Sequence, residues 1–388
     1  MGQVKKILMA CCNYWNSPFQ VGSHHIAKGF LDLGWEVAFI SDPISPLHVL
    51  AGVNDELKER YHIYHRNGVR YYDNRLWTYV PAALCTPHNK PILKSEWVYK
   101  NWFKLTYPNI ISEVKSQGFD EVDLVYLDSV TQSFWLDNIK YKKAIFRVAD
   151  KNVGFDKVSD SSRNIESEIA QKVNTVIYTA HNLKEYVLDM KPKQILHVPN
   201  GVNFDHFANA NKTMPDDLKN IPKPIAIYVG AIAEWFDYEW IMAAARALPK
   251  VSFVLIGPDK MAKEKLKPLN NIYLLGRKNY QDVPAYLHNA DVGLIPFNVK
   301  QFPDLVHSIN PLKLYEYMAC GLPTVSTEWE ELKLLRSPSV LSKDVNEFIG
   351  MISNIIKGKR MPSEDYIDYA RQYRWSHKVK ELVEFLSV

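Results

Sequence analysis

Residues 308–327 read SINPLKLYEYMACGLPTVST, a short helical pattern that stops at a glycine and passes directly into a β-branched strand. Pro311 suits the first helical position, and Asn310 or Ser308 suits the cap before it. Gly321 is followed by a second breaker, proline, so the helix should end after about three turns. A helix that leads straight into a buried strand is the repeating unit of an α/β fold.

The same alternation of apolar runs and helical stretches continues along the chain, whose 388 residues are too many for one ordinary core. Strands that are apolar on both faces and alternate with helices indicate a parallel sheet covered on both sides. We therefore expect two tandem, doubly wound, Rossmann-like α/β domains. The runs are KILMACC, WEVAFIS, VDLVYLD, AIFRVAD, TVIYTA and QILHVP, then PIAIYVG, VSFVLIG, NIYLLG, DVGLIPF, LPTVST and SVLS.

The first domain is expected to span 1–203 and the second 204–370, with a C-terminal helix at 371–388 that packs back on the first. A Pro-Asn-Gly turn at 199–201 interrupts the pattern, and the polar stretch 209–223 is expected to act as linker and hinge. Ligands bind outside the carboxyl ends of the strands in such sheets, so two facing sheets predict a cleft between the lobes.

Composition excludes several classes of protein. An apolar fraction of 47% and a charged fraction of 23% are those of a soluble globular protein, and a net charge of +4 gives no support to nucleic-acid binding. The four cysteines form no C-x-x-C pair, so we expect reduced thiols and no metal site. The N-terminal run ILMACC is too short for a signal peptide or a membrane span, which favours the cytoplasm.

Residues 66–107 do not follow the alternation and are dense in aromatics and lysines. Two readings of 94–107 remain open: a packed helix with a solvated face, and a membrane-surface helix with aromatics and lysines at headgroup level. The second reading would place the protein peripherally on the inner face of the cell membrane.

Lys313 and Glu316 lie in the first turns of the helix within 308–327 and project from the same side. Free N–H groups and the helix dipole favour an anion at this position, and Lys313 adds a full positive charge. A diphosphate fits there, and the carboxylate of Glu316 can accept hydrogen bonds from two ribose hydroxyls. The alternative is an i,i+3 surface ion pair.

Several motifs together resemble the GT-B glycosyltransferases of bacterial polysaccharide synthesis. These motifs are NPLKLYEYMACGLPTVST, VPNGVNFDHF, YVGAIAEWFDYEWI, FVLIGP, LLGRKNYQDVPAYLHNADVGLIPF and YARQYRWSHKVKEL. The chain is most similar to transferases like the xanthan glucuronosyltransferase and the teichuronic-acid transferases. The resemblance implies that the second domain holds a nucleotide diphosphate-sugar and that the first receives the acceptor.

The resemblance also implies roles for the donor-binding residues. Glu316 would bind ribose, and Lys313 would contact the diphosphate or the donor sugar. Gly276, Arg277 and Tyr280 would bracket the base. Gly230 would let the backbone approach the phosphates, and Asn310 and Leu312 at the helix start complete the donor set.

Two departures from the family pattern bear on the chemistry. Ser308 stands where many retaining relatives carry the first of two glutamates, which argues against retention. The stretch after the first strand of the second domain offers Glu234 and Trp235 where relatives use Arg and Lys on the pyrophosphate, so Lys313 carries more of the charge neutralisation. Asp237 is expected to cap the following helix.

An inverting transferase needs one general base for the acceptor hydroxyl. Asp150, at the end of AIFRVAD, is the best candidate, since a similar strand-end aspartate is proposed as base in the glucuronosyltransferase-like relatives. Its alternative role is a helix cap or turn residue. Asp128 is a weaker rival for which capping or packing is favoured, and Arg147 and Lys151 flank Asp150 as a source of positive charge.

The loop and helix start NYWNSPFQVGSHHIAKGF follow the first strand and should reach the site. Gly22 gives conformational freedom and Ser23 can cap the helix. His24 or His25 can reach the donor sugar or the acceptor, with His25 as the catalytic candidate, while at least one of the two should simply pack.

The sequence thus predicts a transferase that moves a hexose or hexuronate from a UDP-sugar to a glycan or polyprenyl-linked acceptor, with no metal and no cofactor. A nucleotide-sugar epimerase of the same fold and a non-catalytic nucleotide- or sugar-binding protein are the alternatives. An oxidoreductase is disfavoured because no G-x-G-x-x-G follows the first strand.

Overall fold

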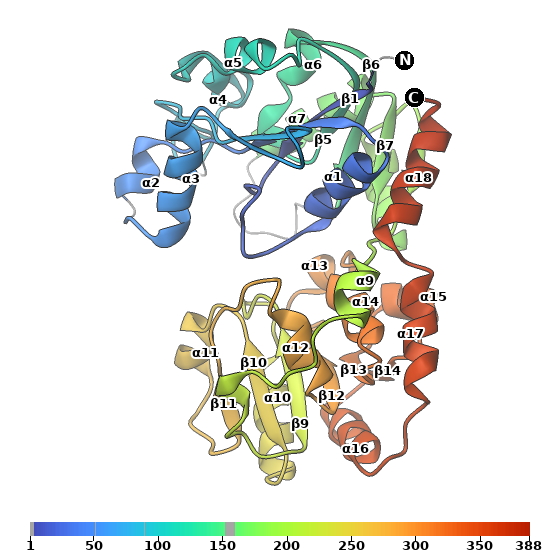
Figure 1. The fold of residues 1–388 in the computed structure, drawn as a ribbon. Helices are drawn as coiled ribbons and strands as arrows, with labels where there is room; N and C mark the ends of the chain where they lie inside the picture. Colours follow the sequence, from blue (N-terminus) through green and yellow to red (C-terminus); the bar gives the residue numbers. More distant parts are fainter. Residues whose placement is uncertain (1–3, 51, 89, 152–159) are drawn as a thin grey trace. The chain divides into compact units, whose positions relative to one another are not determined.

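The computed structural model describes residues 4–50, 52–88, 90–151 and 160–388 (Figure 1). The chain divides into two compact units, Met1–Pro199 together with Ser376–Val388, and Asn200–Trp375. Within the described residues, no helix combines the length and the apolar character that crossing a membrane requires.

The first unit is built on an eight-stranded sheet with the order β3-β4-β2-β1-β5-β6-β7-β8, in which only the β3–β4 pair is antiparallel. The strands are β1 (Lys6–Cys11), β2 (Glu36–Ser41), β3 (Val69–Tyr71), β4 (Leu76–Tyr79), β5 (Glu121–Leu127), β6 (Lys140–Val148), β7 (Thr175–Tyr178) and β8 (Ile195–His197). The helices are α1 (Gly22–Asp32), α2 (Pro46–Leu50), α3 (Asp55–His65), α4 (Glu96–Asn101), α5 (Ile110–Ser116), α6 (Trp135–Asn138), α7 (Asp160–Lys172), α8 (Lys184–Asp189) and α18 (Trp375–Leu386), with 3-10 turns η1 (Trp102–Leu105) and η2 (Val130–Gln132).

The six strands expected in this half are confirmed, and the hairpin β3–β4 was not expected. Its turn holds Tyr72, Asp73 and Asn74 at φ of 53°, 53° and 68°, a left-handed conformation that ordinary residues rarely adopt. The polar turn interrupts the apolar pattern, which is why 66–107 did not read as strand. C-terminal helix α18 packs on α1 so closely that a β-carbon at Gly29 would lie 2.6 Å from Val379 Cγ2.

The second unit has an all-parallel six-stranded sheet with the order β11-β10-β9-β12-β13-β14, as predicted. Its strands are β9 (Ile225–Val229), β10 (Ser252–Ile256), β11 (Ile272–Leu274), β12 (Val292–Ile295), β13 (Thr324–Thr327) and β14 (Val340–Ser342). Its helices are α9 (Phe204–Ala208), α10 (Tyr238–Ala247), α11 (Lys260–Lys265), α12 (Val283–His288), α13 (Pro303–His307), α14 (Leu312–Ala319), α15 (Glu330–Leu335), α16 (Val345–Ile356) and α17 (Ser363–Arg371).

The end of α14 follows from its sequence. Gly321 adopts φ of 68°, the left-handed conformation that glycine tolerates best. The N–H of Gly321 donates to the carbonyl of Met318 at 2.9 Å, and the N–H of Leu322 donates to that of Tyr317 at 3.0 Å. This is a Schellman motif, and it turns the chain into β13.

The polar stretch 209–223 lies inside the second unit. Leu218 is fully buried there, and Asp217 accepts from Tyr286 at 2.7 Å and pairs with Lys278 at 2.6 Å. The expected linker is therefore part of a packed domain, because these tertiary contacts outweigh its polar composition.

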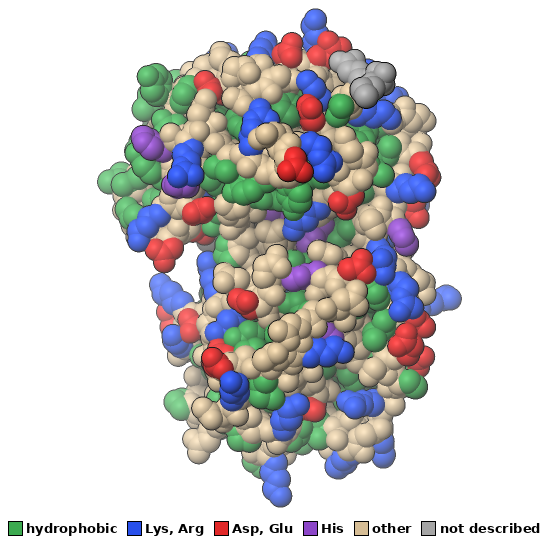
Figure 2. Space-filling model, viewed as in Figure 1, with side chains coloured by type: hydrophobic (Ala, Val, Ile, Leu, Met, Phe, Trp, Pro, Cys, Tyr) green, Lys and Arg blue, Asp and Glu red, His purple; other side chains and the backbone are tan. Residues whose placement is uncertain are grey.

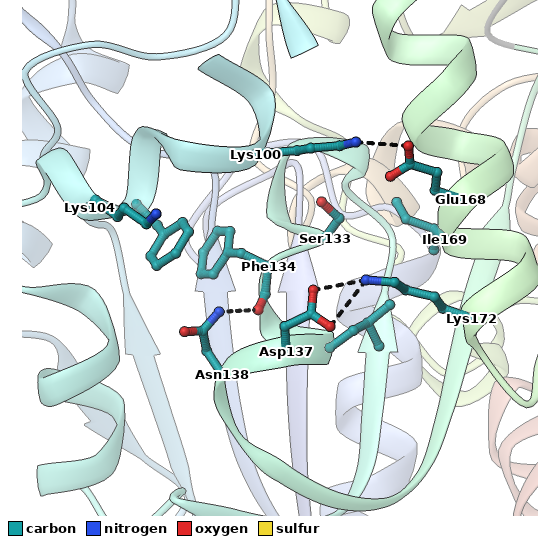
Figure 3. A pocket seen from close by; sticks show the side chains of 11 residues that line it. Lys100, Lys104, Ser133, Phe134, Asp137, Asn138, Glu168, Ile169 and Lys172 are labelled. Carbon is teal, nitrogen blue, oxygen red and sulfur yellow. Dashed lines mark hydrogen bonds and ion pairs between the residues drawn. The ribbon is translucent and has the colours of Figure 1, made fainter. Parts of the chain in front are cut away.

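Segment 94–107 forms α4 and η1, and the packed reading is the one the structure supports. Val98, Trp102 and Phe103 are buried in the core of the first unit. Beside them lies a pocket between η1, α6 and α7, in which Lys100 pairs with Glu168 at 2.8 Å (Figure 3). Lys172 pairs there with Asp137 at 2.9 Å, so these two lysines behave as expected of a solvated helix face.

Candidate functional site

Three glycines follow consecutive strands of the second unit at the carboxyl edge of the sheet. Gly230 follows β9, Gly257 follows β10, and Gly276 lies just beyond β11. The N–H of Gly257 donates to the carbonyl of Gly276 at 3.0 Å, and a β-carbon at Gly257 would lie 1.9 Å from the oxygen of Gly230. The backbones are in contact, so a side chain is excluded at Gly257. Gly257 was not predicted as a site residue, although its place at a strand end was a visible signal.

Lys313 reaches this glycine edge from the first turn of α14. Its Nζ lies 4.8 Å from the ring centre of Phe297 and 5.4 Å from that of Tyr228, distances typical of cation–π contacts. A β-carbon at Gly230 would stand 3.1 Å from Lys313 Cε. The structure therefore brings together Lys313 and Gly230, which were predicted from separate motifs.

Two tyrosines fix α14 and the end of β9, and neither was predicted. Tyr317 Oη accepts a hydrogen bond from the N–H of Val229 at 2.8 Å. Tyr228 Oη donates to the carbonyl of Ala231 at 2.6 Å. Both side chains are fully buried. In the sequence they stand within apolar stretches and cannot be told apart from ordinary core aromatics.

Glu316 lies one turn after Lys313 and is half-buried. Burial raises the pKa of its carboxyl group to about 7, and the charge of Lys313 opposes this shift. Tyr280 stacks on His206 with ring centres 4.7 Å apart, and burial, followed by the charge of Glu316, raises the pKa of its phenol. Of the predicted donor-binding set, Lys313, Gly230, Glu316 and Tyr280 form one cluster. The side chain of Arg277 is exposed.

The helix start differs from the prediction. Pro311 is the N-cap residue of α14, Leu312 is its first residue, and the helix has eight residues, about two turns. Asn310 does not cap it, because its side chain donates to Glu331 at 2.8 Å and accepts from Tyr315 at 3.0 Å.

Ser308 does not cap α14 either. It ends the preceding helix, α13, and its hydroxyl donates to the carbonyl of Leu305 at 2.7 Å. Asp237 caps α10 as expected, since it accepts from the N–H of Trp240 at 2.9 Å.

A buried ion pair lies at the carboxyl edge of the first unit's sheet. Arg147 Nη1 is 3.2 Å from Asp128 Oδ1, and the Ser23 hydroxyl also donates to Asp128. Ser23 lies inside α1 rather than capping it, and Gly22 is helical. A β-carbon at Gly22 would lie 2.4 Å from Arg147 Nη2, so close approach and not conformational freedom calls for glycine here.

Asp150 is half-buried and lies two residues beyond the end of β6. It lines a pocket with Asp128, Arg147 and Glu166, of which Glu166 is buried and accepts from Tyr186 Oη at 2.6 Å. Lys151 is half-buried beside it. Glu166 was not predicted, because it stands in a polar stretch of α7 without any strand-end signal.

The two histidines of α1 are both buried. The His24 ring bonds the N–H of Val21 at 3.2 Å and lies 3.0 Å from the carbonyl oxygen of Tyr14, and burial lowers its pKa to about 4. His24 is therefore a neutral packing residue, which is the role expected for at least one of His24 and His25. His25 is 3% exposed at the same helix start.

A further polar cluster lies after β2. Asp42 Oδ1 accepts hydrogen bonds from Ser129 at 2.6 Å, Thr131 at 2.8 Å and Gln132 at 3.1 Å. Burial raises the pKa of Asp42, and these donors oppose the shift. The cluster joins the ends of β2 and β5 and was not predicted.

Two family models match the chain, one in each unit. Residues 9–179 match the N-terminal domain of the glucuronosyltransferase GumK, and residues 223–357 match the glycosyl transferases group 1. The chain is 25% identical over 241 residues to TuaH of Bacillus subtilis, a teichuronic acid biosynthesis glycosyltransferase, covering 58% of this chain and 60% of that protein.

A second relative is the UDP-glucuronate:glycolipid 2-beta-glucuronosyltransferase of Xanthomonas campestris pv. campestris. It is 25% identical over 168 residues, which cover 42% of this chain and 40% of that protein. The matched regions thus span less than two thirds of the length of either curated relative.

Solved structures share the fold at low sequence identity. The sucrose-phosphate synthase of Thermosynechococcus elongatus has a TM-score of 0.68 at 15% identity, covering 99% of this chain and 98% of that one. HepE of Anabaena, solved in complex with UDP and glucose, has a TM-score of 0.66 at 15% identity, covering 99% of both chains. The resemblance read from the sequence is thus confirmed: each unit matches a glycosyltransferase family model, and the chain has the GT-B fold.

Proposed function

We propose that this protein transfers a sugar from a UDP-sugar to a hydroxyl of a glycan or lipid-linked acceptor in polysaccharide synthesis. The main support for a UDP-sugar site is the position of the Lys313 ammonium, which lies beside Gly230 at the carboxyl edge of a parallel sheet. The two relatives named for polysaccharide and glycolipid chemistry, and a fold neighbour that holds UDP, support the choice of substrates.

In this proposal the diphosphate lies at the start of α14, where Lys313, the helix dipole and the backbone N–H groups supply positive charge. These groups of the chain do the work that a metal ion does elsewhere, and no cofactor takes part. Glu316 accepts hydrogen bonds from the ribose hydroxyls, and the backbone near Gly276 and Arg277 with the ring of Tyr280 brackets the base.

The chemical step is proposed to invert the anomeric centre. Asp150 takes the proton of the acceptor hydroxyl as that oxygen forms its bond to the anomeric carbon. The bond from this carbon to the nucleotide oxygen breaks, and UDP leaves with the electron pair, stabilised by Lys313. Arg147 and Asp128 hold the floor of the pocket on which Asp150 lies, and His25 contacts a sugar hydroxyl.

An epimerase of the same fold would convert the donor without an acceptor, and a binding protein would form no product. Separating the products made with and without a glycan acceptor distinguishes these three functions. The absence of any acceptor-dependent product from every UDP-sugar tried would contradict the transferase.

Calorimetric titration with UDP tests the donor site. Lys313→Ala and Glu316→Ala should each lose most of the affinity, whereas Lys263→Ala should not, because Lys263 pairs with Asp259 on α11 and serves as a matched control. Wild-type affinity in both site variants would refute the site.

A further inference from the structure

An apolar groove of about 700 Å³ lies in the first unit, outside the clusters described above. This volume falls in the range of small-molecule sites. Figure 2 shows apolar side chains gathered over α2 and α3, at the left of the view. The groove is lined by Ile44, Ser45, Pro46, Val49, Leu50, Val53, Leu57, Lys58, Tyr61, Tyr64, Ala82, Ala83, Leu84, Leu105 and Tyr107.

The groove side chains are large, apolar and open to solvent. Leu50 is 81% exposed, Tyr107 80%, Leu84 76% and Val49 57%. Contiguous apolar surface of this kind is rare on soluble proteins unless something binds it. Single exposed residues need no explanation, but here four of them line one concavity.

One wall of the groove is a face of α3. Leu57, Tyr61 and Tyr64 recur at i, i+4 and i+7, so they lie on one side of the helix, and all three line the groove. Chain segments 82–84 and 105–107 also line the groove. The lining therefore consists mostly of hydrocarbon, with few polar groups.

The inner end of the groove adjoins the carboxyl edge of the sheet. Ile44 lines the groove two residues after Asp42, whose carboxylate belongs to the polar cluster that joins β2 and β5. Arg60 spans this junction, since its Nη2 donates to the carbonyls of Asp42 at 2.9 Å and Pro43 at 3.1 Å. The groove thus leads to the edge on which Asp150 lies.

Two basic side chains lie at the groove, Lys58 in its lining and Arg60 at its junction with the sheet edge. Arg60 Nε is buried and has no hydrogen-bond acceptor within the part of the chain that the structure describes. Lys58 pairs with Asp55 at 2.9 Å, so Arg60 is the basic group that remains for an anion. An anionic group joined to an apolar chain matches this arrangement.

We propose that the groove binds the hydrocarbon chain of a lipid phosphate that carries the acceptor sugar, with the phosphate beside Arg60. This assignment rests on the proposed function and specifies its acceptor. A peptide is the poorer occupant, because a buried backbone needs hydrogen-bond partners and the lining offers few. A hydrocarbon chain needs none, and a phosphate satisfies the guanidinium.

The experiment uses the full chain and geranylgeranyl phosphate as probe, titrated below its aggregation point and followed by tryptophan fluorescence. Val49→Ser, Leu50→Ser and Leu84→Ser are combined in one variant, which should fold because all three side chains are exposed. We expect its affinity for the probe to fall at least about tenfold. Leu33→Ser with Leu188→Ser, exposed apolar positions outside the groove, should bind as wild type does.

Further measurements separate the alternatives. Arg60→Gln should lower affinity for geranylgeranyl phosphate but not for geranylgeraniol. Equal affinity of the groove variant and wild type would overturn the proposal, as would binding to phosphatidylglycerol vesicles without binding to the single lipid. A change from dimer to monomer in the groove variant would also overturn it and would assign the groove to a second copy of the chain. UDP titration of the same variant should be unchanged, so failure of the groove is distinguishable from failure of the donor site.

Discussion

Gly230 and Lys313 are 83 positions apart in the chain, yet a β-carbon added to Gly230 would stand 3.1 Å from Cε and 3.4 Å from Nζ of Lys313. Gly230 also adopts φ of 148°, which side chains rarely accept. The glycine therefore leaves room for the ammonium as well as for the turn. A side chain here would strain the turn and crowd the Lys313 side chain, whose charge is proposed to bind the diphosphate.

Gly230→Ala should weaken UDP binding by roughly tenfold, about 1.4 kcal/mol. Uridine lacks the diphosphate and should bind the variant and the wild type equally, which separates displacement of Lys313 from general damage. Calorimetry with both ligands makes the comparison.

Gly350→Ala is the matched control, since no atom lies within 4 Å of its added β-carbon and it stands inside α16. It should stabilise the protein by about 0.5–1 kcal/mol and leave UDP binding intact. Equal loss of uridine and UDP affinity in Gly230→Ala would contradict the role given to Lys313.

The carboxyl group of Glu316 should make stability depend on pH. Its folded pKa is about 7 against an ordinary value of 4.5, so between these values the folded protein holds a proton that the unfolded chain has lost. The free energy of unfolding should therefore fall as pH rises through this window. Glu316→Gln should show a shallower decline in Tm across the same range, and parallel curves would show that this group does not titrate as described.

The same titration should affect ligand binding in the opposite sense. A carboxylate accepts two ribose hydrogen bonds, whereas the protonated acid is a poorer acceptor. UDP affinity of the wild type should therefore rise between about pH 6 and about pH 8. Because the terminal phosphate of UDP also loses a proton at about pH 6, Glu316→Gln should show a smaller rise rather than none. 2′,3′-Dideoxy-UDP, which lacks both hydroxyls, should likewise show a smaller rise with the wild type.

The ion pair between Arg147 and Asp128 should contribute strongly to the free energy of unfolding, because only 6% of the Arg147 side chain and 10% of the Asp128 side chain are exposed. Arg147→Met leaves a buried carboxylate without its partner, and the expected loss is about 3–5 kcal/mol in urea unfolding. Adding Asp128→Asn to that variant should recover part of the loss.

The exposed pair of Lys172 and Asp137, 51% and 62% exposed, gives the control. Lys172→Ala should cost less than about 1 kcal/mol. Similar losses for Lys172→Ala and Arg147→Met would contradict the importance of burial at Arg147.

The strands were predictable because the central ones are built on apolar runs, such as ILMAC in β1 and VAFI in β2. Gly230, Lys313 and Glu316 were predicted from separate motifs, and the structure brings them together because of the order of β9 and β12 in the sheet. Their role as neighbours of one ligand stays a prediction. The role given to Asn310 failed for a related reason. Tertiary partners, Glu331 and Tyr315, take the side chain that local preference assigns to the cap.

The apolar groove could not be foreseen from periodicity. A helical wheel of 94–107 places Trp102 and Phe103 on one arc, which fits a packed helix and a membrane-surface helix alike, and both side chains are buried. The side chains that are exposed instead, such as Leu84 and Tyr107, stand in loops without any repeat. A groove forms where separate segments pack against one another, and the sequence pattern of one segment holds no information about that packing.

Asp150 gives the most direct test of the chemistry. It lies at the pocket lined by Arg147 and Glu166, and as general base it should contribute about 10²–10⁴-fold to kcat. Asp150→Asn should therefore lose transfer at that scale, measured by mass spectrometry of the glycosylated acceptor, while calorimetry finds UDP binding unchanged. Asp137→Asn, a change to an exposed carboxylate paired with Lys172, should keep full activity. If Asp150→Asn retained wild-type kcat, the same measurement on Asp128→Asn and on Glu166→Gln would show which of the other two carboxylates of that pocket is the base.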